Sequence, residues 1–280
     1  MRQNVIDIDY KLDDPWVILS QIEQSIKRKI ESVGTPLKEW DIKINRGILT
    51  GLNEAFIITK EKRDELVGKD PKSDEIIRPI LRGRDIRKNS YEWAGLYIIA
   101  TFPSRHYDID DFPAVRDYLL TFDKRKLEQS GQKDIDGIKG NNARKKTNNR
   151  WFEVQDSIAY WDDFSQQKIL FSEMVSSPQF YLDSQKFLVN DTVTFISGEN
   201  LETLTIFLNS KIIFSIFKLF YAGGGLGNSG IRMKKTFLQK LPLPRVVIQN
   251  DNSKDQEILI SQALTLTDAE FDYLLEAFSI

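Results

Sequence analysis

Short apolar runs, each bounded by turn-forming residues, constrain the fold of this chain more than any other feature. The runs are rich in Ile, Val, Phe and Tyr, and Gly, Pro, Asn or Asp separates each from the next. Such runs predict β-strands. The predicted strands are residues 41–46, 55–59, 96–101, 168–171, 179–182 and 193–196.

The first predicted helix lies before all of these strands. Asp14 can cap it, Pro15 suits its first turn, and Gly34 ends it. Its apolar positions recur every fourth residue and form one stripe, made of Ile18, Ile22, Ile26 and Ile30. A terminal helix with a single stripe must pack on something, either the following domain or a missing neighbour.

Three more helices are predicted further along the chain. Residues 112–129 have one apolar face and a basic end, with Asp111 as a candidate cap. Residues 201–220 are apolar on nearly all sides, so this helix should be buried. Thr267 and Glu270 fit a capping box that opens a last helix through Ala277. Between them, residues 133–149 form a long polar loop, which in a compact domain is usually functional or disordered.

Composition excludes several kinds of chemistry. The 280 residues include no cysteine, which removes disulfides, thiolate zinc sites and cysteine nucleophiles together. The single histidine, His106, lies in a polar and aromatic turn, and we interpret it as an ordinary loop residue. No apolar run approaches the roughly 18 residues that span a bilayer. The first residues are too polar for a secretory signal, so we expect a cytoplasmic protein without a membrane partner.

A glycine motif at residues 225–230 fits the dinucleotide fingerprint G-x-G-x-x-G. That fingerprint needs a preceding strand and a following helix in a βαβ unit. The preceding run is too long for a strand, and Pro242 and Pro244 interrupt the segment after the motif. We therefore interpret residues 223–230 as a flexible loop whose backbone can approach a phosphate, leading to Arg232 and Lys234. An ordinary turn remains an equal alternative.

Catalytic motifs are absent from the sequence. A metal-dependent nuclease needs clustered carboxylates, but Glu173 follows its strand alone, and Asp162 and Asp163 would point in different directions on a strand. Methyl transfer to a base nitrogen would need an Asn-Pro-Pro type loop for the flipped base, and the chain contains neither Asn-Pro-Pro nor Asp-Pro-Pro. We therefore expect no catalytic residue, metal site or cofactor in this chain.

The charge is distributed unevenly although the net charge is −2. Residues 124–150 contain nine basic side chains against three acidic ones, a balance of +6. The last thirty residues contain seven acidic side chains against one lysine, a balance of −6. An acidic tail thus masks a basic middle, and a basic patch is the electrostatic signature of a nucleic-acid partner.

Basic and amide side chains crowd two turns. Arg78, Arg82, Arg84, Arg87 and Lys88 crowd around Gly83, and a second group fills the polar loop that ends at Trp151. Arginine can bind guanine with two hydrogen bonds, asparagine can bind adenine, and lysine positions phosphates. Solvated charged surfaces would give the same composition, so the clusters alone leave the two interpretations open.

Five blocks, in order along the chain, resemble the TaqI-like C-terminal specificity domain of adenine methyltransferases and fused restriction–modification enzymes. The first holds Pro15-Trp16-Val17-Ile18-Leu19, Gly34-Thr35-Pro36-Leu37 and the run from Trp40 to Phe56, with its turn Gly47-Ile48-Leu49-Thr50-Gly51. The others are Ile80-Leu81-Arg82-Gly83-Arg84-Asp85-Ile86, Phe187-Leu188-Val189-Asn190-Asp191, Leu208-Asn209-Ser210-Lys211 and Leu241-Pro242-Leu243-Pro244.

The resemblance implies an α+β fold, with a mixed, mostly antiparallel sheet and flanking helices, like a DNA-methyltransferase target recognition domain. We expect a linker helix at residues 1–40, the recognition domain at 41–248 and an acidic helical tail at 249–280. The implied function is sequence-specific reading of double-stranded DNA beside a methyltransferase or nuclease domain of the same or another chain. S-adenosylmethionine, with or without Mg²⁺, would belong to those parent domains.

The candidate DNA-contacting residues combine the two basic clusters, the Gly47–Gly51 turn and the glycine loop. They are Thr50, Asn53, Arg82, Arg84, Arg87, Lys88, Asn141, Asn142, Arg144, Lys145, Lys146, Arg150, Asn228, Arg232 and Lys234. Two other functions remain as alternatives: a metal-dependent endonuclease, and a protein-interaction scaffold that uses the isoleucine stripe and the acidic tail as its working surfaces.

Overall fold

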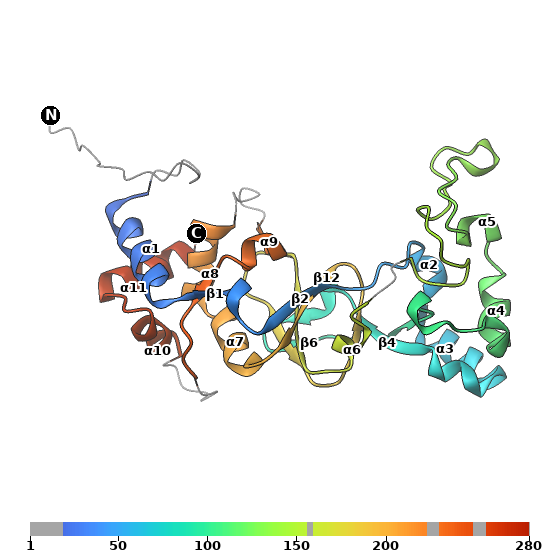
Figure 1. Cartoon of the computed structure of the whole chain (residues 1–280), viewed down its shortest axis with the longest axis horizontal. Coiled ribbons are helices and arrows are strands. Elements are labelled where there is room, and N and C mark those ends of the chain that lie inside the picture. The colour runs from blue at the N-terminus through green and yellow to red at the C-terminus, as the bar shows by residue number, and fades with distance from the viewer. Residues whose placement is uncertain (1–18, 156–158, 223–229, 249–255, 280) are drawn as a thin grey trace.

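The computed structural model describes residues 19–155, 159–222, 230–248 and 256–279. The molecule is elongated, with the helices near the two termini at one end and helices α3, α4 and α5 at the other (Figure 1). Between the ends lie two four-stranded sheets. The mixed α+β fold with mainly antiparallel strands is confirmed.

The central sheet separates two hydrophobic cores. Its strands are all antiparallel, in the order β10 (Phe180–Asp183), β8 (Lys168–Ser172), β12 (Val193–Gly198) and β2 (Ile42–Arg46). Because successive side chains of a strand point to opposite faces, Ile169 and Phe171 of β8 join one core while Leu170 joins the other. One sheet therefore supports both halves of the molecule.

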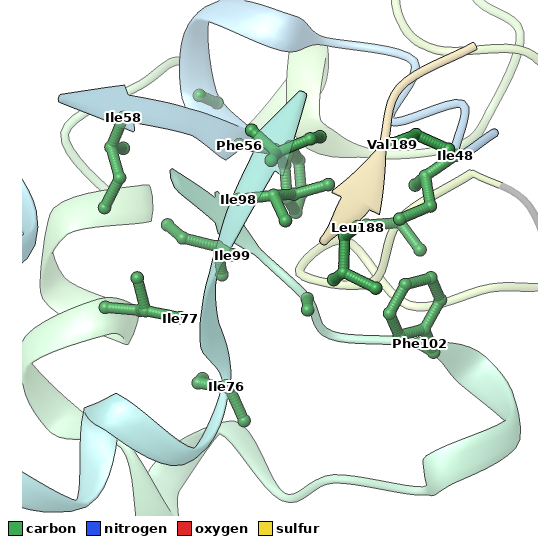
Figure 2. Close-up of a cluster of buried hydrophobic side chains, with 14 of the residues drawn as sticks. Ile48, Phe56, Ile58, Ile76, Ile77, Ile98, Ile99, Phe102, Leu188 and Val189 are labelled. Atoms are coloured by element: carbon green, nitrogen blue, oxygen red, sulfur yellow. The ribbon is translucent and has the colours of Figure 1, made fainter. Parts of the chain in front are cut away.

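The second sheet forms the core of what we call the strand lobe. Its order is β11 (Leu188–Val189), β4 (Ile77–Leu81), β7 (Leu96–Ile99) and β3 (Ile57–Thr59), with β11 parallel to β4. Figure 2 shows Ile98 and Ile99 of β7 among the buried side chains and Ile48 beside Val189. Short helices surround this core: α2 (Asn53–Phe56), α3 (Lys60–Lys69), α4 (Pro113–Leu119), α5 (Lys124–Leu127) and α6 (Trp161–Phe164).

The other core belongs to what we call the helical lobe. It is built from α1 (Gln21–Val33), α7 (Leu201–Leu208), α8 (Lys211–Ile216) with the following π turn (Phe217–Tyr221), α9 (Lys235–Leu238), α10 (Gln256–Ala263) and α11 (Asp268–Ser279). The described residues also form three two-stranded pairs: β1 (Thr35–Pro36) with β14 (Pro242–Leu243), β5 (Ile86–Arg87) with β6 (Ser90–Tyr91), and β9 (Met174–Val175) with β13 (Ile231–Arg232).

The acidic tail packs on the N-terminal helix. Glu270 of α11 accepts hydrogen bonds from Lys29 at 2.6 Å and Ser25 at 2.7 Å, both on α1. Tyr273 donates to Glu23 at 2.9 Å. The carboxylate of Glu270 is thus held against α1 rather than against the basic clusters, and both predicted flanking segments contribute to the core of the helical lobe. The domain boundaries at 40 and 248 stay predictions.

Two predicted helices prove to be broken. Residues 112–129 form α4 and α5, because the Asp123 side chain accepts a bond from the Arg125 amide and starts a new helix. Residues 201–220 break at Asn209, whose side-chain amide pairs with both backbone groups of Phe180 on β10. Ser210 then caps α8. A side chain that bonds to a neighbouring strand has overridden the helical pattern.

Other boundaries differ less. Helix α1 begins at Gln21 behind a Ser20–Glu23 capping box rather than after Asp14, and residues 14–18 lie outside the described residues. The predicted strand at 55–59 is shortened to β3 because α2 covers its first residues. The capping box at Thr267 and Glu270 is confirmed. Strand β4 was missed, because Arg78 and Pro79 interrupt its apolar pattern.

Candidate nucleic-acid interface

The segment 188–193, which runs from β11 into β12, is the common support of two glycine turns. Gly47 donates its amide to Val193 O at 2.8 Å, and a Cβ atom on Gly47 would lie 2.0 Å from Asn190 O. Gly83 donates to Thr192 Oγ1 at 2.8 Å, and a Cβ there would lie 2.9 Å from Thr192 O. Both turns need glycine because their backbones touch this segment directly.

The first turn, Gly47 to Gly51, is stabilised by hydrogen bonds of its own residue Thr50. Thr50 is fully buried, and its hydroxyl donates to Asn53 Oδ1 at 2.6 Å and accepts from the Leu52 amide. Thr50 therefore shapes the entry to α2 and has no free surface for a base, contrary to the prediction from sequence. Asn53 is exposed.

Arg144 is the largest correction to the predicted contacts. It is 3% exposed, and its guanidinium donates to the backbone oxygens of Leu127, Thr50, Glu153 and Trp151 at 2.5–3.0 Å. The group also lies 4.9 Å from the centre of the Phe56 ring. Burial lowers the pKa of Arg144 to about 10, so it stays charged at neutral pH. Its guanidinium nitrogens all donate within the chain, and they fasten the polar loop to the Gly47–Gly51 turn.

That polar loop is an ordered hairpin, which we call the 129–147 hairpin. Backbone bonds join Gly131 to Arg144 O, Ala143 to Gln132 O, and Thr147 to Gln129 O. Both predicted asparagines serve it: Asn142 Oδ1 accepts from the Asp134 amide, and Asn141 Nδ2 donates to Ile135 O. The exposed cations of this region are Lys133, Lys139, Lys145, Lys146 and Arg150.

The second turn, around Gly83, carries two constrained and two exposed cations. Arg82 binds Asp85 through Nε at 3.0 Å and Nη2 at 2.8 Å, and its side chain is 18% exposed. Arg87 binds Glu92 at 2.6 Å and the carbonyl of Arg84. Arg84 and Lys88 are exposed. Arg84 and Lys88 are therefore the side chains of this turn with most freedom to contact a partner.

The end of β8 links the Gly83 turn to the predicted contacts Arg232 and Lys234, which follow the glycine loop. A Cβ on Gly83 would lie 3.0 Å from Ser172 Oγ, at the end of β8. Two residues on, Met174 of β9 pairs with Arg232 of β13. Arg232 and Lys234 are exposed. Asn228 lies outside the described residues.

A family model of the TaqI-like C-terminal specificity domain matches residues 78–243, more than half of the chain. The chain belongs to this family. The matched range contains the Gly83 turn, the hairpin and the segment 188–193, whereas the Gly47–Gly51 turn precedes it.

Two relatives of the specificity domain are Type II methyltransferases. M.BstVI of Geobacillus stearothermophilus is 27% identical over 261 residues, which cover 89% of this chain and 42% of that protein. M.PaeR7I of Pseudomonas aeruginosa is 21% identical over 236 residues, covering 83% and 37%. The specificity domain thus spans less than half the length of either relative.

One solved structure supports the fold. The specificity domain matches the type IIG restriction endonuclease BpuSI with a TM-score of 0.50 and 14% identity, over 92% of this chain and 32% of that one. It also matches the Type IIL restriction–modification enzyme MmeI, solved in complex with DNA, with a TM-score of 0.46 and 11% identity over 87% and 32%.

Arg46 is an exposed cation that was not among the predicted contacts. Arg46, at the end of edge strand β2, is 59% exposed at its side chain and contacts Asp191 through Nη2 at 3.4 Å. It directly precedes Gly47 and borders the segment 188–193. Its position beside the turn glycine was the available signal.

His106, the acidic residues and the apolar helices show no further functional feature in the described part of the specificity domain. His106 is exposed and sits in a left-handed conformation (φ 51°) after a short 3-10 turn. Within the described ranges, no three Asp, Glu, His or Cys side chains are grouped to hold a metal ion. In the same ranges no single helix is long and apolar enough to cross a membrane. Helix α7 and the segment of α8 with its π turn reach that length and apolar character only when taken together, and the two are bent by 68° relative to each other.

Proposed function

We propose that this chain reads a specific sequence in double-stranded DNA as the specificity domain of a Type II restriction–modification methyltransferase. The observation that carries the proposal is the shared support at 188–193. It places Arg46, the Gly47 turn with the attached hairpin, and the Gly83 turn on one short segment. Exposed arginine and lysine side chains project from each of these elements.

The chemistry of those side chains fits a duplex. Cations that neutralise phosphates release counterions, which gives affinity without sequence preference. Arginine and asparagine carried on rigid turns can then distinguish base edges in the major groove. We assign phosphate contacts to Lys145, Lys146 and Arg150, and base reading to Arg84 and Asn53.

The catalytic chemistry is assigned to the rest of the parent protein. We propose that the parent transfers a methyl group from S-adenosylmethionine to the N6 atom of adenine, with or without a Mg²⁺-dependent endonuclease, in the cytoplasm. The Type II methyltransferase relatives support the transferase part of this proposal. This chain would supply the choice of site.

The test is selection of a binding sequence from a library of random duplexes by the 280-residue chain. We expect one enriched sequence, bound more tightly than a scrambled duplex. Arg84→Ala should lower affinity for that sequence at least about fivefold, the low end of a lost arginine–guanine pair. Arg28→Ala, an exposed position of α1 at one end of the molecule, is the matched control and should bind as wild type does (Figure 1). Enrichment of no sequence would overturn the proposal.

The scaffold alternative loses part of its proposed surfaces. Ile26 and Ile30 of the isoleucine stripe are buried in the core of the helical lobe, together with Leu274 of α11. Glu270 of the acidic tail is bound to α1. Ile26, Ile30 and Glu270 are therefore engaged within the chain, whereas Asp268, Asp272 and Glu276 of the tail are exposed.

A further inference from the structure

The 129–147 hairpin ends in an exposed apolar side chain. Ile138 lies at its tip and is 60% exposed, while Ile135 beside it is fully buried. The hairpin is the yellow-green loop above α5 in Figure 1, and it projects away from the body of the strand lobe. A large aliphatic group in this position is covered by nothing in the described parts of the chain.

The tip has a defined conformation. Asp134 accepts the Gly140 amide on its carboxylate at 2.8 Å, and the Asn141 amide donates to Ile138 O at 3.0 Å. Gly137 and Gly140 adopt left-handed conformations, with φ of 72° and 83°. Asp134 and Asp136 are left-handed as well, with φ of 48° and 59°, a conformation that glycine adopts freely and aspartate more readily than most residues. Ile138 is therefore held outward by a specified turn.

The surroundings of Ile138 are polar and positively charged. Lys133, Lys139, Lys145 and Lys146 are exposed along the hairpin. The two acidic groups near the tip are already engaged, since Asp134 holds the Gly140 amide and Asp136 binds Arg125 at 2.6 Å and 2.8 Å. A protein partner would favour a wider apolar patch. A single apolar group on a cationic hairpin fits a polyanion that displays isolated apolar groups.

Duplex DNA displays such a group in one place. The major groove is about 12 Å wide and admits a two-stranded ribbon, and the thymine 5-methyl is the apolar group on its floor. Resting on the proposed function, we propose that the 129–147 hairpin enters the major groove and that Ile138 contacts a thymine methyl. Arg144, buried at the base of the hairpin, fixes its direction of approach.

The test replaces each thymine of the selected duplex in turn by uracil, which lacks only the methyl group. Binding of wild type and Ile138→Ala to each duplex is measured by fluorescence anisotropy. We expect one uracil position to weaken wild-type binding about three- to fivefold, the effect of losing one buried methyl group. The same position should have no effect on Ile138→Ala.

Leu120→Ala is the matched control, because Leu120 is an exposed aliphatic residue (47%) of the same lobe outside the hairpin. It should respond to every uracil as wild type does. Thermal unfolding of both variants should match wild type. Failure to enrich any duplex would overturn the proposed function and this inference with it. Specific binding in which Ile138→Ala responds to every uracil as wild type does would overturn this inference alone.

Discussion

The two lobes share one sheet but use their buried polar groups differently. In the helical lobe, Glu270 and Lys29 join the C-terminal helix to the N-terminal one. In the strand lobe, the guanidinium of Arg144 and the amide of Gln129 bind backbone oxygens of irregular segments. The pair of Glu270 and Lys29 therefore joins two helices of the same lobe, α11 and α1. The guanidinium of Arg144 anchors the 129–147 hairpin to the Gly47–Gly51 turn, and segments that connect regular elements on a rigid scaffold often carry binding residues.

The largest effect should come from removing the support of the hairpin. Arg144→Met deletes hydrogen bonds to four backbone carbonyl groups, so we expect a loss of about 3 kcal/mol in the free energy of unfolding. Urea denaturation measures this loss, and hydrogen exchange should become faster at the Gly131 and Thr147 amides. Arg144→Lys, which keeps the charge but not the planar fork, should recover only part of the stability. If Arg144→Met left the stability unchanged but weakened DNA binding, Arg144 would contact DNA, as the sequence first predicted.

The close approach of Gly47 to Asn190 gives the next effect. A methyl group at this position meets the Asn190 carbonyl, so Gly47→Ala should destabilise the protein by about 2 kcal/mol. Gly68→Ala is the control, because Gly68 lies in α3 with no atom within 4 Å of an added Cβ. That variant should gain up to about 1 kcal/mol. Equal urea midpoints for the two variants would refute the tight turn.

In the helical lobe, the ionisation of Glu270 should make a smaller, pH-dependent contribution to the free energy of unfolding. Burial favours the neutral form of Glu270, but bonds from Lys29, Ser25 and Thr267 outweigh it and lower its pKa to about 2 from an ordinary 4.5. A lowered folded-state pKa stabilises the protein above the unfolded value, and this stability is lost as pH falls from about 4.5 towards 2. Glu270→Gln, which can keep the capping box, should cost about 1 kcal/mol at pH 7. A difference between the variant and wild type that does not shrink by about pH 3 would contradict the assignment.

The sequence predicted those parts of the fold whose pattern is local. The strands at Ile42, Lys168 and Val193 and the capping box at Thr267 follow from alternation and from short-range hydrogen bonds. The break at Asn209 could not be predicted, because its cause is a bond to a strand 29 residues earlier in the chain.

The same limit applies to the candidate site. Arg144 and Lys145 are neighbours in one basic run, and composition treats them alike. Arg144 is buried because the carbonyls of Thr50 and Leu127, distant in sequence, surround it. Lys168 is likewise hidden in a predicted strand, where it pairs with fully buried Asp183 at 2.6 Å. Sequence located the basic segments, but only the fold separates supporting cations from exposed ones.

The salt dependence of DNA binding by Lys145→Gln/Lys146→Gln tests the central claim most directly. Both side chains are exposed, so stability should change by less than about 0.5 kcal/mol. If each lysine neutralises one phosphate, the slope of log affinity against log salt should become shallower by about 1.8 for the pair. Arg28→Gln on α1 should leave that slope unchanged. An unchanged slope in the double variant would contradict the assignment of this surface to DNA.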